Sequence, residues 1–288
     1  MEPKDIEVEI DTQLGRGACG VVNRAVHRPT GTLLAIKCVR VEEREKREQL
    51  MTDLQSLLKL QNSANLVHLY AAYFHKQSGR VHVALELMDL GSLQDFLRFL
   101  PPTGFMEPIA AEIFCQTASG LRHLHAHRQI HRDIKPGNIL LNSLGEVKIA
   151  DFGISKSLDS TAGICDTFVG TATYMSPERA TGATYSVSAD IWSLGIVLYE
   201  LASGHFPFPR RSSFPALFDF LCNKPEPRLA PEGHSEGVRS AVERCLQRSP
   251  EKRASAGELC ESGFCSIACG RQDLATYLVG LKSIEGHS

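Results

Sequence analysis

The sequence predicts an α+β fold of two lobes, in which a small five-stranded antiparallel sheet with one main helix (residues 1–88) precedes a larger, mostly helical lobe (residues 89–288). Apolar residues alternate with period two in most of the first lobe and recur with a period near 3.6 in the second. Of the 288 residues, 43% are hydrophobic and 22% charged, as in globular proteins. The chain can therefore bury a sizeable core and is neither disordered nor fibrous.

The first lobe begins with strands and contains one helix. Three apolar stretches separated by Gly-rich or Pro-Thr-Gly turns lie at residues 6–10, 21–26 and 33–36. In residues 42–60, leucines recur at three- and four-residue spacing behind a charged run, which is typical of an amphipathic helix. Two further strand-like runs, 66–74 and 81–88, complete a sheet of five strands.

The second lobe is mostly helical. Ser92 is a suitable N-cap for a helix over residues 93–100. Residues 112–126 carry a stripe of apolar residues with helical period, and residues 190–202 are apolar nearly all round, as in a fully buried helix. Two short strands, 139–141 and 147–150, flank the turn Asn142-Ser143-Leu144-Gly145 and predict a hairpin.

Charge and cysteine usage exclude several classes of protein. The net charge of -2 supplies no broad positive field, so we expect no nucleic-acid partner. No apolar stretch approaches the ~20 residues that a membrane helix needs, and the N-terminus lacks the apolar region of a secretory signal. The nine cysteines are odd in number and form no Cys-x-x-Cys pair, which predicts reduced thiols in a cytoplasmic or nuclear protein.

The first chemical motif is a Gly-rich loop. Gly15-Arg16-Gly17-Ala18-Cys19-Gly20-Val21-Val22 lies between two predicted strands and is followed by more strand. A dinucleotide-binding fingerprint would open a helix here, so that interpretation is disfavoured. The loop is either an ordinary turn or a hairpin whose bare N–H groups cover phosphates.

Lys37 follows this loop at the end of a strand. It is either a residue at the sheet edge or a cation directed at phosphates beneath the loop. In the second case it needs an anionic partner. Asp53 falls on the apolar flank of the following helix, where an unpaired acid would be costly, and is our candidate partner.

The strongest signal is His131-Arg132-Asp133-Ile134-Lys135-Pro136-Gly137-Asn138, followed by Asp151-Phe152-Gly153. Phosphoryl transfer needs a carboxylate to accept the proton of the attacking hydroxyl (Asp133), oxygen ligands for Mg²⁺ (Asn138, Asp151) and a cation near the transferred phosphate (Lys135). The alternative, turn and capping residues around a hairpin, does not explain why four motifs occur together in this order.

With these motifs the sequence resembles a protein kinase domain from the Gly-rich loop to Arg253. The resemblance implies ATP and Mg²⁺ as cofactors and the catalytic residues Lys37, Asp133 and Lys135. It also implies a buried Glu178–Arg253 ion pair and an acid, Asp190, that holds the catalytic loop. The family's usual partner of the lysine is a glutamate, so Asp53 departs from the pattern.

The same resemblance assigns the nucleotide site. Leu85 would be the gatekeeper and Glu86 and Met88 the hinge that binds adenine. Leu57, Leu69, His131 and Phe152 would stack as a spine. The whole set of implied nucleotide-binding residues is Leu14, Gly15, Gly17, Gly20, Val22, Ala35, Lys37, Asp53, Leu85, Glu86, Met88 and Leu140.

Within the kinases the sequence resembles the MAP kinase kinases, which are dual-specificity enzymes. The residues that carry this resemblance are the segment Cys165 to Arg179, Tyr185-Ser186 and the run Asp190 to Gly195. It implies a MAP kinase as substrate, phosphorylated on Thr and Tyr. The residues before the first strand include no basic-hydrophobic docking segment of the kind this family uses.

Arg132, beside Asp133, suggests control by phosphorylation, since a phosphorylated loop would supply an anion of about -1.5 to -2 charges. Thr167 is the best acceptor for an upstream kinase, Thr161 the second and Ser160 a third. The alternative is that these are ordinary loop hydroxyls. Cys19 at the loop tip is a candidate for oxidative inhibition.

The sequence leaves three hypotheses about function. The first is a MAP kinase kinase, and the second another serine/threonine kinase of a related group. The third is a pseudokinase or scaffold that binds nucleotide without catalysis, which the intact Lys37, Asp133, Asn138 and Asp151 disfavour. We expect no zinc site, because His123, His125 and His127 read as a surface helix end and Cys260, Cys265 and Cys269 are irregularly spaced.

Overall fold

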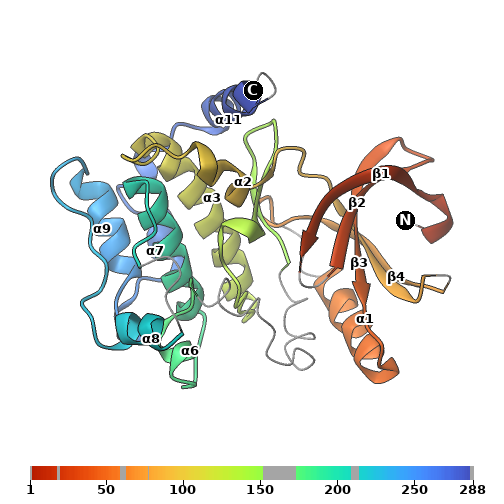
Figure 1. The fold of residues 1–288 in the computed structure, drawn as a ribbon, viewed down its shortest axis with the longest axis horizontal. Helices are drawn as coiled ribbons and strands as arrows, with labels where there is room; N and C mark the ends of the chain where they lie inside the picture. The colour runs from red at the N-terminus through yellow and green to blue at the C-terminus, as the bar shows by residue number, and fades with distance from the viewer. Residues whose placement is uncertain are drawn as a thin grey trace.

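A computed structural model describes residues 2–17, 20–58, 63–76, 78–151, 173–208 and 214–285. It has the predicted two lobes: Figure 1 shows the sheet and helix α1 at one end and the remaining helices at the other. The chain passes between the lobes after strand β5 (Arg80–Glu86) and enters the helical lobe at the short strand β6 (Gly91–Ser92). The predicted α+β class is confirmed.

The first lobe is one antiparallel sheet in the order β1-β2-β3-β5-β4. Its other strands are β1 (Ile6–Gly17), β2 (Gly20–His27), β3 (Thr32–Arg40) and β4 (Leu69–His75). Helix α1 (Arg44–Leu58) packs against β4, with Leu50 and Leu54 each 1% exposed in the main hydrophobic core. The leucine periodicity therefore predicted the buried positions Leu50 and Leu54, whereas Leu58, the last residue of the helix, is 39% exposed.

The Gly-rich segment is a hairpin, as predicted, because β2 continues as strand directly after it. Gly17 and Gly20 pair at its tip. Gly20 has φ +145°, and a Cβ at this position would lie 2.1 Å from the carbonyl oxygen of Cys38. Only glycine fits so close to the neighbouring strand.

The second lobe is built around two long helices, α3 (Glu107–Ala126) and α7 (Ser188–Ser203). Helix α7 is buried along nearly its whole length and ends at Gly204 with φ +77°. Its Trp192 is 1% exposed. Within the described residues of this lobe the other α-helices are α2 (Leu93–Phe96), α6 (Pro177–Ala180), α8 (Phe214–Cys222), α9 (Glu236–Cys245), α10 (Ala256–Cys260) and α11 (Arg271–Glu285).

Predicted boundaries in this lobe differ from the observed ones by several residues. Ser92 begins α2 as expected, since the Asp95 carboxylate accepts hydrogen bonds from its N–H and hydroxyl. The α-helix ends at Phe96, however, and continues as a 3₁₀ turn over Leu97–Phe99. The predicted hairpin is present as β7 (Ile139–Leu141) and β8 (Val147–Ile149), with β8 ending one residue before the predicted Ala150.

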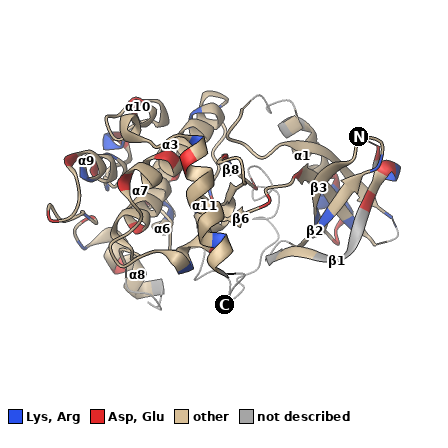
Figure 2. Cartoon of the chain, turned by 90° about the horizontal axis from the view of Figure 1, so that it is seen from above, with Lys and Arg blue, Asp and Glu red and all other residues tan. Residues whose placement is uncertain are grey.

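Acidic and basic residues are interspersed over both lobes (Figure 2). Among the described residues no helix is both long and apolar enough to span a membrane.

The expectation that all cysteines are reduced is wrong for two of them. Cys115 on α3 and Cys265 in the 3₁₀ turn Cys265–Ile267 form a disulfide across 150 residues of sequence. The two bonded cysteines are far apart in the sequence. The pairing depends on the packing of this turn against α3, which cysteine spacing does not show.

We expect reduction of this disulfide to lower stability, because the bond closes a long loop in the unfolded chain. Bonds of this kind contribute about 2–4 kcal/mol. At about 2–4 °C per kcal/mol, thermal unfolding with and without dithiothreitol should differ by about 4–16 °C. In Cys115→Ser the two curves should coincide; a wild-type protein indifferent to the reductant would contradict the prediction.

Candidate active site

The β-sheet presents one face to the catalytic loop. Val22 lies directly opposite Lys37 across β2 and β3, and Ala35 lies opposite Leu85 across β3 and β5. Residues opposite one another, and residues two apart on one strand, project from the same face. These four predicted nucleotide-site residues therefore share one face of the sheet.

Lys37 is nearly buried and reaches the helical lobe. Its side chain is 8% exposed, and its Nζ lies 2.6 Å from Oδ1 of Asp151. This gives the lysine a different partner from the predicted one. Asp53 instead accepts a hydrogen bond from Gln49, one turn earlier in α1. In this conformation the predicted Lys37–Asp53 pairing is thus replaced by an ion pair with the carboxylate predicted to bind metal.

The catalytic loop brings three predicted residues together. Asn138 donates from Nδ2 to Oδ2 of Asp133 at 2.8 Å and to the Asp133 carbonyl oxygen at 2.7 Å. Lys135 Nζ lies 2.8 Å from the same Oδ2. Because Asn138 donates through its nitrogen, its amide oxygen is the atom that it offers to a cation.

A buried carboxylate holds the backbone of this loop. Asp190, 1% exposed, accepts hydrogen bonds from the N–H groups of His131 and Arg132, both at 2.8 Å. Arg132 has φ +73°, a conformation that costs a non-glycine residue about 1–3 kcal/mol unless its surroundings enforce it. The two hydrogen bonds to Asp190 hold Arg132 in this conformation. They confirm the prediction that Asp190 holds the catalytic loop.

His131 fixes the position of the segment that carries Asp151. Its Nδ1 accepts from the N–H of Asp133 at 3.2 Å, so its Nε2 is the donor to the carbonyl oxygen of Ala150 at 2.8 Å. The ring thereby connects the catalytic loop to the residue before Asp151. Asp151 itself has φ +62°, a second strained backbone in the same site.

The reading of the three histidines as a surface helix end is wrong for His125. Its side chain is 11% exposed, and its Nε2 lies 2.9 Å from Oδ2 of Asp190. It thus supports the carboxylate that holds the catalytic loop. No pattern in the sequence distinguishes it from His123 and His127, because the contact depends on how α3 packs on α7.

The predicted adenine site has an apolar floor. Leu85, Met88 and Leu140 pack in one small hydrophobic cluster with Val67 and Ala150. Leu85 also belongs to the sheet face that carries Val22 and Ala35. The cluster is therefore continuous with the apolar part of that face.

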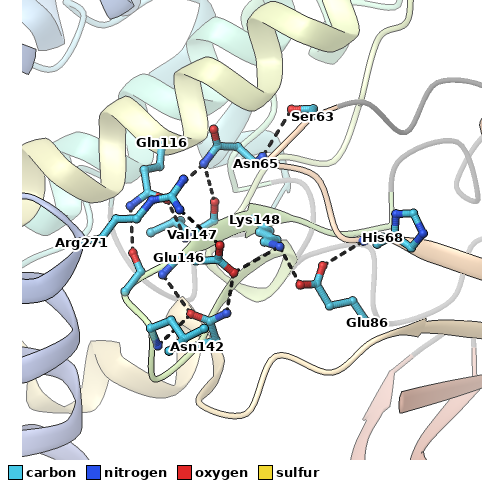
Figure 3. Close-up of polar contacts among 12 residues, drawn as sticks. Ser63, Asn65, His68, Glu86, Gln116, Asn142, Glu146, Val147, Lys148 and Arg271 are labelled. Carbon is cyan, nitrogen blue, oxygen red and sulfur yellow. Dashed lines mark hydrogen bonds and ion pairs between the residues drawn. The ribbon is translucent and has the colours of Figure 1, made fainter. Parts of the chain in front are cut away.

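The predicted hinge residue Glu86 also has an unexpected charged partner. Its Oε1 lies 2.6 Å from Nζ of Lys148 on β8, and its Oε2 accepts from the N–H of His68. Lys148 is 11% exposed and also lies 3.3 Å from Glu146 (Figure 3). Lys148 is the one charged residue in the apolar strand Val147–Ile149. This was the sequence feature that could have indicated a charged partner nearby.

The network continues to the C-terminal helix. Arg271 at the start of α11 lies 3.3 Å from Glu146 (Figure 3). Burial alone would raise the pKa of Glu146, but a hydrogen bond from Asn142 and the charges of Lys148 and Arg271 hold that pKa below its ordinary value. Ionic contacts therefore connect the hinge, the β7–β8 hairpin and α11.

Two cations face one aromatic ring beside the catalytic loop. The guanidinium groups of Arg132 and Arg179 lie 5.7 Å and 5.3 Å from the ring centre of Tyr185. Arg179 also donates to the Arg132 carbonyl oxygen. Arg132 is thus held beside a second positive charge, an arrangement suited to an anion.

Several residues to which the sequence analysis assigned a role lie outside the described part of the chain. These are the phosphorylation sites Thr161, Thr167 and Ser160, the thiol of Cys19, and Phe152 and the Leu57 side chain of the predicted spine. Of the other spine members, Leu69 is 3% and His131 1% exposed. At the loop, Leu14 is 51% exposed, and a Cβ on Gly15 would meet no neighbouring atom.

The predicted Glu178–Arg253 ion pair is confirmed. Arg253 Nη1 and Nη2 each lie 2.7 Å from one oxygen of Glu178. Its remaining three N–H groups donate to the carbonyl oxygens of Ser188, Gln247 and Arg248, so all five donors are used.

Comparison with known proteins agrees with this geometry. The protein kinase domain family matches residues 8–265. Mitogen-activated protein kinase kinase 3 of Arabidopsis thaliana is 39% identical over 274 residues, which cover 94% of this chain and 52% of that protein. Mitogen-activated protein kinase kinase 2 of the same plant is 38% identical, with 87% of this chain and 70% of that protein covered. A mitogen-activated protein kinase kinase of the fungus Pyricularia oryzae is 37% identical, and the match covers 91% of this chain and 64% of that protein. The chain thus spans about half the length of the first of these relatives.

Proposed function

The chain belongs to the protein kinase family and, within it, to the MAP kinase kinases, and from this membership we propose that it phosphorylates Thr and Tyr of a MAP kinase with ATP. The single observation that carries the proposal is the convergence of Asp133, Asn138 and Lys135 in one loop, with Lys37 and Asp151 paired nearby. A scaffold without catalysis would not need this arrangement.

The donor set fits ATP with Mg²⁺. An Asp carboxylate and an Asn amide oxygen are hard oxygen ligands, and Lys37 supplies a cation from the sheet side. Mg²⁺, when bound, would neutralise charge on the phosphate oxygens. Asp151 and Asn138 would hold it, and Val22, Ala35, Leu85, Met88 and Leu140 would enclose adenine.

Asp133 would act as the proton acceptor. The substrate hydroxyl attacks the γ-phosphorus, the bond from that phosphorus to the ADP oxygen breaks, and the hydroxyl proton passes to the Asp133 carboxylate. Asn138 orients this carboxylate through its Nδ2 bond, and Lys135 supplies positive charge where the transferred phosphoryl group passes. Asp190 and His125 keep the loop in position without touching the substrate.

The substrate proposal is tested with a panel of catalytically inactive MAP kinases. We expect incorporation of phosphate on both a Thr and a Tyr of at least one of them, mapped by mass spectrometry. Phosphate on a generic serine/threonine substrate, with none on any MAP kinase, would favour another kinase group. No incorporation by the activated protein on any substrate would favour the scaffold.

Control by phosphorylation gives a separate prediction. Thr167→Ala should lower kcat about 10- to 100-fold, since a charge-assisted contact to Arg132 is worth about 1.5–3 kcal/mol. The KM for ATP should stay nearly unchanged, because the nucleotide site is elsewhere. Steady-state kinetics after treatment with an upstream kinase measure both, with Thr276→Ala, at an exposed threonine of α11, as the matched control. Equal kcat for Thr167→Ala and wild type would refute the assignment.

The location of the protein stays a prediction. We propose a cytoplasmic or nuclear protein from the proposed activity, since the Cys115–Cys265 disulfide removes the argument from reduced thiols.

A further inference from the structure

An open pocket lies on the first lobe, outside the nucleotide cleft. It occupies about 520 Å³ where the end of β3, the start of α1 and the β4–β5 turn meet. Figure 1 shows this region at the side of the sheet that α1 covers. The lining residues are Arg40, Val41, Glu42, Arg47, Phe74, Ser78, Gly79 and Arg80.

The pocket concentrates positive charge in a chain whose net charge is -2. Arg40 and Arg80 stand directly opposite each other across β3 and β5. Like charges directly opposite in an antiparallel pair destabilise a sheet. Arg47 adds a third guanidinium, and the lining has one carboxylate, that of Glu42.

That carboxylate is already engaged. Glu42 pairs with Arg40 at 2.9 Å, both side chains being about three-quarters exposed. Among the residues that the structure describes, Arg47 and Arg80 form no ion pair. Arg47 is placed by a ring instead, with its guanidinium carbon 4.2 Å from the centre of Phe74.

We propose that this pocket is a docking site for a phosphorylated segment of a partner protein, with the phosphate held by Arg80 and Arg47. A phosphoryl group carries about two negative charges and three acceptor oxygens, which matches two planar guanidinium groups that have no carboxylate partner. Arg47 stacked on Phe74 loses little freedom when it binds.

The pocket also suits a peptide better than a bare anion. Phe74 and the buried Val41 (6% exposed) give it an apolar wall beside the charges. A volume of about 520 Å³ exceeds what one phosphate needs and leaves room for a neighbouring side chain. Arg47 belongs to the first turn of α1, so a bound segment would touch the start of the helix that carries Asp53.

The experiment compares retention of two degenerate peptide libraries on the immobilised full chain, one with a fixed central phosphothreonine and one with threonine. We expect wild type to retain the phosphorylated library at least about tenfold better. Arg80→Gln and Arg47→Gln should lose this preference. Arg28→Gln, the same charge change at an exposed arginine in the turn after β2, should keep it.

Three results would overturn the proposal. They are equal retention of the two libraries by wild type, an unchanged preference in both pocket variants, and complete displacement of the phosphorylated library by an equal concentration of inorganic phosphate. The last would identify a site for a free anion rather than for a peptide.

Thermal unfolding separates loss of binding from loss of fold. Without ligand, Arg80→Gln should unfold about 1–2 °C above wild type, because it removes the repulsion between Arg40 and Arg80. A lower unfolding temperature in both pocket variants would show that the arginines serve the fold, and would contradict the proposal.

Discussion

Asp133→Asn should lower kcat for transfer to protein by about 10²–10⁴-fold, the usual contribution of a general base. The substitution keeps the shape of the side chain and removes its ability to accept a proton. The KM for ATP should change little, since the predicted contacts to the nucleotide come from other residues. Incorporation of labelled phosphate from ATP with Mg²⁺ measures the effect.

Asp95→Asn is a matched control for this change. Like Asp133, Asp95 is a carboxylate that accepts hydrogen bonds. Its donors are the N–H and hydroxyl of Ser92 at the start of α2. We expect its variant to retain kcat. If Asp133→Asn kept wild-type activity, another group would have to accept the proton and the catalytic assignment would be wrong.

Arg253→Met should have the largest effect on stability, lowering the free energy of unfolding by about 3–5 kcal/mol. The arginine side chain is fully buried and its Glu178 partner is 8% exposed. Removing the cation would leave a buried carboxylate without its bidentate partner. The charge also lies 5.2 Å from the ring centre of Trp192, so packing in the core of the lobe would change too.

Denaturant unfolding of Arg253→Met, of Glu178→Gln, of their double variant and of the control Arg28→Met tests this explanation. The double variant Glu178→Gln with Arg253→Met should be less destabilised than Arg253→Met alone, because it leaves no unpaired charge. Arg28→Met, which breaks the exposed pair with Glu7, should change stability little. Additive effects at Glu178 and Arg253 would show that the two residues do not act as a pair.

The same pair predicts how stability depends on pH. Burial alone would raise the pKa of Glu178, but the hydrogen bonds and charge of Arg253 outweigh it and lower that pKa from 4.5. A carboxyl whose pKa is depressed by folding stabilises the protein fully above its unfolded pKa. This contribution should therefore be complete above about pH 4.5 and be lost as the pH falls through the lower folded pKa.

Local pattern predicted most of the fold and much of the site. The sheet, α1 and the β7–β8 hairpin follow from hydrophobic period and turn residues. Asp133, Asn138 and Lys135 belong to one short loop, so their convergence is a local property that spacing can show. The Glu178–Arg253 pair is distant in sequence and came from family resemblance alone.

What sequence reasoning missed depends on how distant elements pack. Helical geometry placed Asp53 on the apolar flank of α1, but its hydrogen bond from Gln49 is exposed and Lys37 pairs with Asp151 instead. His125 contacts Asp190 only because α3 crosses α7. The Cys115–Cys265 disulfide has the same origin, since α3 packs on a turn far along the chain.

The most direct test of the central claim is a crystal structure of the phosphorylated protein with a non-hydrolysable ATP analogue and Mg²⁺. The account predicts that Asp151 and Asn138 coordinate the metal, that Lys37 contacts the phosphates and that Asp133 faces the γ-phosphorus. A structure with the metal bound by other residues, or with Asp133 directed away from the γ-phosphate, would contradict it.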